Sequence, residues 1–179
     1  MTKIRQGGPD DATAILAMMD TAVAWLAANG RTGQWGDEPF SAVPRRVASI
    51  TDKTRTDTIW IAEVDGAPAG AIATSPVPMP YVSPAEEPEL YITLLVTDRS
   101  FAGRGVGGAL LAHAAGTARE SGVDLVRVDC YAGDDGRLVD YYRRNGFTPT
   151  KTFAVEGWPG QVLERRVLSG PSRGAAPRR

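Results

Sequence analysis

A glycine-rich segment between two apolar stretches constrains the fold of this chain most. The segment "AGRGVGG" (102–108) follows the almost wholly apolar "ELYITLLV" (89–96) and leads into an alanine-rich stretch that ends near Ser121. An apolar run of this kind is typical of a strand buried on both faces. Glycines permit positive φ and close backbone approach, and N–H groups at a helix N-terminus bind phosphate. The sequence therefore predicts a strand, a turn that holds an anionic group, and a helix.

Two nucleotide-binding motifs fit this turn poorly. A Walker-type loop needs Lys followed by Ser or Thr, and no such pair follows the glycines. The dinucleotide pattern G-x-G-x-x-G is formally present in Gly103, Gly105 and Gly108, with Asp129 about 20 residues further on. However, "TDRSFA" separates the strand from Gly103, and only one further helix remains for additional βα units. A turn that merely connects strand and helix is the plainer alternative.

Periodicity and turn signals predict a mixed α/β order in the rest of the chain. Asp65-Gly66 joins two strands as a hairpin, and Asn29-Gly30 and Asn145-Gly146 close two helices. The expected strands are 2–7, 58–64, 68–75, 89–96, 123–131, 148–155 and 161–168. The expected helices are 8–30, 44–54, the stretch after the glycine turn, and 137–147. The order is that of a mixed sandwich rather than a repeating βαβ array.

Length and composition favour one globular domain. The chain has 179 residues, of which 42% are hydrophobic and 23% charged. We expect a single domain over 1–168 and a disordered basic tail over 169–179. The net charge of −1 gives no reason to expect nucleic acid or an anionic membrane as a partner. We see no spanning segment of about 20 apolar residues and no signal peptide, so we expect a cytoplasmic protein. The single cysteine, Cys130, excludes an intrachain disulfide and argues against a metal site.

Two motifs in register resemble the GNAT acetyltransferase superfamily. Its hallmark R/Q-x-x-G-x-G/A is matched by Gly105 and Gly107, although Ala102 stands where the family has Arg or Gln. The second hallmark, Y-x-x-x-G-F, is matched by Tyr142 and Gly146-Phe147. The resemblance covers residues 89–150 and implies an α/β GNAT acyl-CoA N-acyltransferase fold. In that fold a mixed central sheet is splayed at the cofactor site and flanked by helices.

The resemblance also implies acetyl-CoA as cofactor and a primary amine of a small molecule, a metabolite or an aminated antibiotic, as acceptor. The amine would attack directly, through a tetrahedral intermediate. The pantetheine arm would pair with Leu94, Leu95 and Val96, and Asp135 stands where relatives carry a cofactor-binding Asn. Arg104 would supply a countercharge to the pyrophosphate. The pyrophosphate would lie on the backbone of Gly103, Arg104, Gly105, Val106, Gly107 and Gly108.

The catalytic roles follow from the needs of acyl transfer. The Val96 N–H is the expected oxyanion donor. Tyr142 is the expected general acid, with packing beneath the cofactor sulfur as the alternative. The strand 89–96 contains no acid except Glu89 at its start, which could act as base through a water chain or be simply solvated. Asp98 is a further candidate, and an amine of low pKa would need no base.

Among the side chains outside these motifs, few are predicted to have a functional role. Trp35, beside Asp37 and Glu38, is the expected acceptor-site residue, since acids beside an aromatic ring suit a cationic amine. Trp25 and Tyr141 are expected in the core. His113 is expected to be solvated or packed, and Cys130 to be a small buried hydrophobe rather than a nucleophile.

Two alternatives to a small-molecule enzyme remain open. The acceptor could be a protein amine, because loops rather than the fold determine the acceptor. A non-catalytic acyl-CoA-binding or sensing module would explain Ala102 and the missing strand acid. A homodimer is also compatible with the sequence.

Overall fold

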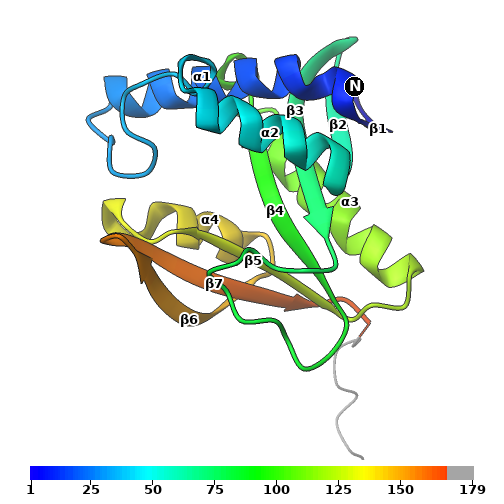
Figure 1. Cartoon of the computed structure of the whole chain (residues 1–179). Coiled ribbons are helices and arrows are strands. Elements are labelled where there is room, and N and C mark those ends of the chain that lie inside the picture. Colours follow the sequence, from blue (N-terminus) through cyan, green and yellow to red (C-terminus); the bar gives the residue numbers. More distant parts are fainter. Residues whose placement is uncertain (169–179) are drawn as a thin grey trace, which may run out of the picture.

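A seven-stranded mixed sheet organises residues 1–168, which are the residues that the computed structural model describes (Figure 1). The strand order is β1-β2-β3-β4-β5-β7-β6, with β4 and β5 parallel and the other neighbours antiparallel. The expected mixed α/β fold is confirmed, and the predicted tail lies outside the described residues. The strands are β1 (Thr2–Gln6), β2 (Thr58–Val64), β3 (Ala67–Ser75), β4 (Glu89–Thr97), β5 (Leu125–Tyr131), β6 (Thr148–Val155) and β7 (Trp158–Arg166).

Helices cover both faces of the sheet because its central strands are apolar on both faces. In β2, Ile59 and Ile61 belong to one buried cluster, whereas Ala62 and Val64 belong to the other. The first cluster contains side chains from α1 (Ala12–Ala28) and α2 (Pro44–Thr56), which lie side by side in Figure 1. The second contains side chains from α3 (Val106–Glu120) and α4 (Arg137–Arg144).

Helix α1 corrects the expectation that the sequence contains no apolar segment of membrane-spanning length. The segment Pro9–Ala28, which is α1 with a preceding 3-10 turn, is long and apolar enough to cross a membrane by length and composition alone. Its side chains Ile15, Met18, Met19 and Val23 are buried in the first cluster. A core helix of a globular domain has this same apolar character.

Strands β4 and β5 diverge after a short paired stretch, as Figure 1 shows. Their last pair is Ile92 with Val128. The next residue, Thr93, is skipped in the pairing of β4 with β3, and its hydroxyl donates a hydrogen bond to Asp57 Oδ2 at 2.5 Å. Such a bulge bends its strand. The rest of β4 therefore leaves β5, which confirms the predicted splay.

Candidate active site

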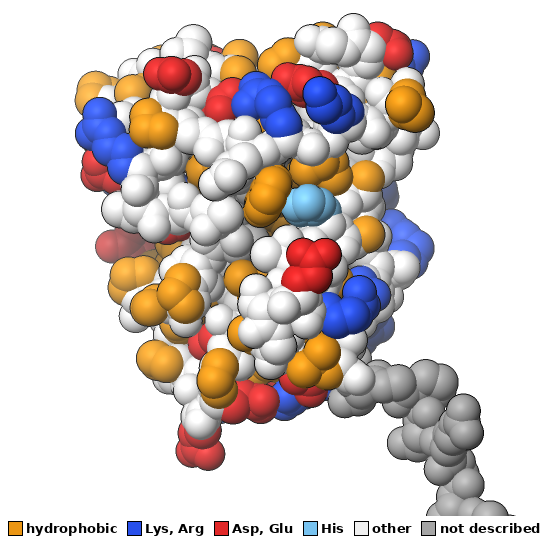
Figure 2. Space-filling view, turned by 90° about the vertical axis from the view of Figure 1, so that its right-hand side faces the viewer, with side chains coloured by type: hydrophobic (Ala, Val, Ile, Leu, Met, Phe, Trp, Pro, Cys, Tyr) orange, Lys and Arg blue, Asp and Glu red, His pale blue; other side chains and the backbone are white. Residues whose placement is uncertain are grey.

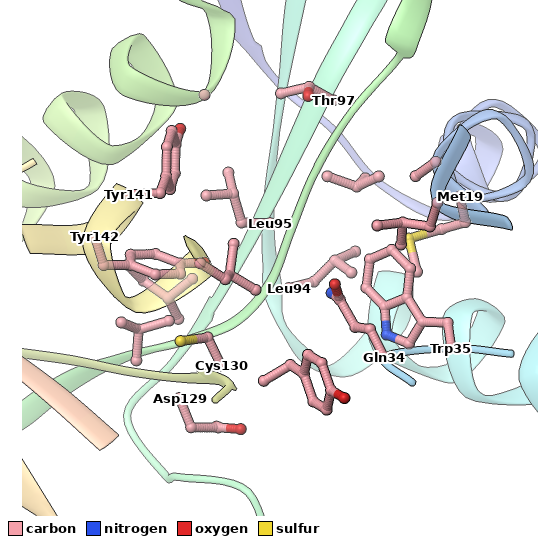
Figure 3. A pocket seen from close by; sticks show the side chains of 18 of the residues that line it. Met19, Gln34, Trp35, Leu94, Leu95, Thr97, Asp129, Cys130, Tyr141 and Tyr142 are labelled. Carbon is pink, nitrogen blue, oxygen red and sulfur yellow. The ribbon is translucent and has the colours of Figure 1, made fainter. Parts of the chain in front are cut away.

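The opening between β4 and β5 contains a cavity of about 970 Å³. Figure 3 shows Tyr141 and Tyr142 on one side of β4, and Gln34 and Trp35 on the other. The structure thus brings most of the predicted site residues around one space. Those that line it are Trp35, Leu94, Leu95, Val96, Gly103, Gly105, Val106, Gly107, Gly108 and Tyr142.

The glycine turn presents backbone, not side chains, to this cavity. Gly105 precedes α3 with φ of 71°, a left-handed conformation that favours glycine, and no side chain caps the helix there. A Cβ on Gly107 would collide with the hydroxyl of Tyr141. No described side chain accepts a hydrogen bond from the first N–H groups of α3, and the absence of a side chain on Gly107 leaves space that the Tyr141 hydroxyl occupies. This arrangement fits a pyrophosphate.

Arg104 is turned away from the cavity, contrary to the expectation that it supplies a countercharge. Its guanidinium pairs with the exposed Asp65 at 3.3 Å, and its N–H donates to the Phe101 carbonyl. Arg99 lines the cavity instead, with its Cζ 3.8 Å from the ring centroid of Trp25. Trp25 is therefore a partly exposed cavity residue and not, as expected, part of the core.

The unpaired part of β4 faces Tyr142 and Cys130 across the cavity. Tyr142 is buried and packs edge-on against Tyr141 and Phe147. Burial raises the pKa of the Tyr142 phenol well above its ordinary value, so the phenol keeps its proton. Burial also raises the pKa of the Cys130 thiol to about 12, which keeps it from acting as a thiolate nucleophile.

Three acids considered from the sequence do not face the cavity. Glu89 is buried and binds Arg127 through both carboxylate oxygens, at 2.6 and 2.8 Å. Asp98 accepts a hydrogen bond from the Ser100 N–H at 2.8 Å and so caps the turn after β4. Asp135 is exposed and outside the cavity lining. The expected roles of Glu89 as base and Asp135 as cofactor ligand thus lack support from position.

Among the described residues, the carboxylate that lines the cavity is that of Asp129 on β5. Tyr91 donates a hydrogen bond to its Oδ1 at 2.5 Å, and Tyr81 donates to its Oδ2 at 3.1 Å. Burial raises the pKa of Asp129 above the ordinary carboxyl value, and the two phenols and the charge of Lys53 partly oppose this shift. The sequence carries a signal for Asp129, an acid inside the apolar strand "LVRVDCY". Burial of a charged group is costly unless it is paired or hydrogen-bonded, so such a residue is a candidate functional group.

Comparison with known proteins identifies the family. The sequence profile of the acetyltransferase (GNAT) family matches residues 19–147. The chain belongs to this family. Solved GNAT structures share the fold, and no curated protein sequence matches the chain.

Three of these solved structures illustrate the range of relatives. One, provisionally assigned as a phosphinothricin N-acetyltransferase, is 21% identical with a TM-score of 0.68, over 94% of this chain and 100% of that one. The ribosomal-protein-alanine N-acetyltransferase of Brucella melitensis is 21% identical with a TM-score of 0.64, over 92% and 99%. YncA of Salmonella typhimurium, provisionally assigned as an acetyltransferase and solved with its cofactor acetyl-CoA, is 17% identical with a TM-score of 0.63, over 98% and 99%.

In this GNAT chain the loop after α1 forms the wall opposite Tyr142. Trp35 packs edge-on against Phe40, and Arg46 donates to the Trp35 carbonyl at 2.9 Å. Trp158 of β7 donates its indole N–H to the Gln34 carbonyl at 2.9 Å, which ties the loop to the far side of the cavity. Asp37 and Glu38 are exposed and do not line the cavity.

Outside the main cavity, the histidine and the charged side chains of residues 1–168 form no metal site. His113, the sole histidine (pale blue in Figure 2), packs edge-on against Trp60 and lies outside the cavity. Acidic and basic side chains alternate over the face in Figure 2. Within residues 1–168 no three His, Cys, Asp or Glu side chains cluster as a metal site would require.

Proposed function

We propose that this GNAT protein transfers an acetyl group from acetyl-CoA to the primary amine of a small cationic molecule. The observation that carries the proposal is the continuous cavity, which joins the glycine turn to Asp129 along the unpaired part of β4. Family membership supports acetyl transfer, and the YncA structure supports acetyl-CoA as the donor.

The glycine turn and β4 would hold the cofactor. The backbone of Val106, Gly107 and Gly108 would bind the pyrophosphate, because the N-terminus of α3 carries partial positive charge. The edge of Leu94–Val96 that β5 leaves would pair with the pantetheine arm. Bound there, the cofactor supplies an activated acyl thioester.

Two groups beside that edge would act on the reacting atoms. A main-chain N–H on the edge of β4 that β5 leaves would donate to the thioester carbonyl oxygen as it gains negative charge, a preorganised interaction that stabilises the transition state. The Val96 N–H expected for this role faces β3, because Val96 pairs with Ala71 and the Asp98 N–H two residues on donates to the Ala69 carbonyl at 2.9 Å. The N–H that faces the cavity at this edge is that of Leu95. The protonated Tyr142 hydroxyl would return a proton to the departing sulfur.

Asp129 would bind the acceptor ammonium and take its proton. Its carboxylate is the acid on the cavity wall, and the two tyrosine hydroxyls hold it in place. A raised carboxyl pKa brings a base closer to neutral pH, where it works best. Position therefore favours Asp129 over Glu89, which Arg127 neutralises.

The acceptor end is shaped for a compact amine. Tyr81 offers aromatic surface beside Asp129, and Trp35 adds aromatic surface on another wall of the same cavity. Aromatic rings together with a carboxylate attract an organic cation. The contact between Trp158 and Gln34 restricts one side of this end. This restriction favours a small molecule over an extended protein segment.

Thiol release from acetyl-CoA against a panel of small amines, amino acids and amino-terminal peptides tests the proposal. We expect release that depends on a small cationic amine and exceeds hydrolysis without amine by at least tenfold. Thiol release with peptides but with no small amine would indicate that the acceptor is a protein amine. Tight acetyl-CoA binding with no release from any amine would contradict the enzyme and support a sensing module.

A further inference from the structure

A second cavity of about 480 Å³ adjoins the first between α1 and α4, and arginines dominate its charge. We name it the arginine cleft, after the four arginines in its wall. Within residues 1–168, none of these four forms an ion pair with a carboxylate. Its charged residues are Arg31, Arg99, Arg137 and Arg144, with Asp134 and Asp140. Asp140 pairs with Arg143, at 3.8 Å.

Two of these arginines share one aromatic ring. The Cζ of Arg99 lies 3.8 Å, and that of Arg31 5.4 Å, from the ring centroid of Trp25. The two like charges repel each other, and the buried Nε of Arg99 has no hydrogen-bond partner among the described residues. A cation held in this way is stabilised by a bound anion. The arrangement therefore indicates a binding site rather than a structural contact.

The cleft continues the site of the proposed function. Arg99, Trp25 and Tyr141 line both cavities, and the Tyr141 hydroxyl lies against Gly107 at the start of α3. Gln34, from the acceptor-side loop, also lines both. A ligand in the main cavity can thus extend into the cleft from the cofactor side or from the acceptor side.

We propose that the arginine cleft binds an oxyanion group, a phosphate ester or a carboxylate, of a ligand held in the main cavity. One guanidinium group can bind two oxygens of such a group at once, through two directional, charge-assisted hydrogen bonds. The group has two sources: the 3′-phosphate of the cofactor nucleotide, or an acidic substituent on the acceptor amine. This inference rests on the proposed function for the ligands of the main cavity.

Calorimetric titration distinguishes the sources without measuring turnover. The first arm compares coenzyme A with 3′-dephospho-coenzyme A. The second compares an α-amino acid with its amide, each titrated into protein saturated with coenzyme A. We expect the wild type to bind the oxyanion-bearing ligand of one pair at least tenfold more tightly. We expect Arg99→Gln to reduce that ratio to about one.

Matched variants separate the cleft from general charge and from misfolding. Arg144→Gln removes an exposed arginine from the opposite wall and should reduce the same ratio without affecting folding. Arg45→Gln, which removes an exposed arginine of α2 outside both cavities, should leave the ratio at its wild-type value. Ratios near one for both pairs in the wild type would overturn the proposal. Equal losses in Arg45→Gln and Arg99→Gln would also overturn it.

Failure of the cleft and failure of the proposed function give different results. Adenosine 3′,5′-bisphosphate contains no thioester and no pantetheine arm, and it probes the cleft with the nucleotide part of the cofactor, including the 3′-phosphate. Wild-type binding of this nucleotide or of an acidic amine that Arg99→Gln abolishes, together with no thiol release, would keep the cleft and refute the transferase. Normal thiol release together with unchanged binding ratios in Arg99→Gln would support the transferase and refute the cleft.

Discussion

The Tyr91 hydroxyl donates a hydrogen bond to the Asp129 carboxylate, and so joins β4 to β5 at the acceptor end of the cavity. Tyr91 is fully buried, whereas Tyr81, the second donor to this carboxylate, is 43% exposed. Burial raises the pKa of both phenols, so both remain donors. The carboxylate is thus held from two sides while it lines the cavity.

Asp129→Asn should remove the base and leave the cofactor site intact. We expect amine-dependent turnover to fall about 100-fold or more, with unchanged affinity for acetyl-CoA in calorimetry. The free energy of unfolding should also differ between the two proteins, and the difference should depend on pH. The raised pKa means that the folded state binds this proton more tightly than the unfolded chain. The wild type should therefore lose stability relative to Asp129→Asn as the pH rises through that pKa. Full activity in Asp129→Asn would contradict the assignment.

Tyr81→Phe should shift the pH dependence of turnover. The Tyr81 hydrogen bond lowers the pKa of Asp129, so its loss should raise that pKa further. The base works only when ionised, and the acid limb of kcat/KM should therefore move to higher pH. Lys53, which lines the cavity on α2 and also lowers this pKa, stays in place in the variant. A pH profile identical to that of the wild type would argue against Asp129 as the titrating group.

Tyr142→Phe should separate catalysis from packing. The phenylalanine ring keeps the edge-on contacts with Tyr141 and Phe147 and removes only the proton donor. We expect kcat to fall about 100-fold, with Tm and acetyl-CoA affinity near those of the wild type. Unchanged kcat would leave Tyr142 with a packing role alone.

Trp158→Phe should weaken acceptor binding. It removes the hydrogen bond to Gln34, which contributes about 1 kcal/mol and corresponds to a rise in acceptor KM of roughly fivefold. Trp60→Phe is the matched control, because the Trp60 indole nitrogen has no hydrogen-bond partner among the described residues. Equal effects of the two substitutions on acceptor KM would refute a role for the Trp158 contact.

Glu89→Gln should damage the fold rather than the chemistry. Its carboxylate is 3% exposed and pairs with Arg127, and the loss of one partner of a buried pair costs about 3–5 kcal/mol. Urea unfolding should show this loss, while the folded variant keeps the wild-type kcat. A tenfold lower kcat in folded Glu89→Gln would restore Glu89 as the base.

The predictable parts of this structure depend on local signals. The glycines, the apolar strand before them and the Asp65-Gly66 hairpin each specify their own backbone, and the structure has all three. The sequence predicts that the last strand begins at 161, because Pro159 and Gly160 resemble a turn, whereas β7 begins at Trp158. In the fold, Gly160 leaves room for the ring of Phe153 on the paired strand.

The directions of charged side chains depend on distant partners and could not be predicted. Arg104 follows the glycine motif, yet Asp65 of the hairpin holds it outside the cavity. Arg99 precedes the motif and enters the cavity because Trp25 of α1 lies beneath it. Glu89 is held by Arg127 from β5. Each of these contacts joins segments that pack together only in the folded chain.

Calorimetric titration of acetyl-CoA into the wild type, Gly107→Val and Gly116→Val tests the central claim most directly. Gly107 lies at the cavity against Tyr141, whereas a side chain on Gly116 of the same helix would meet open space. We expect one-site micromolar binding to the wild type and Gly116→Val, and at least tenfold weaker binding to Gly107→Val. Absence of acetyl-CoA binding to the wild type, or equal binding to all three proteins, would contradict a cofactor site at the glycine turn.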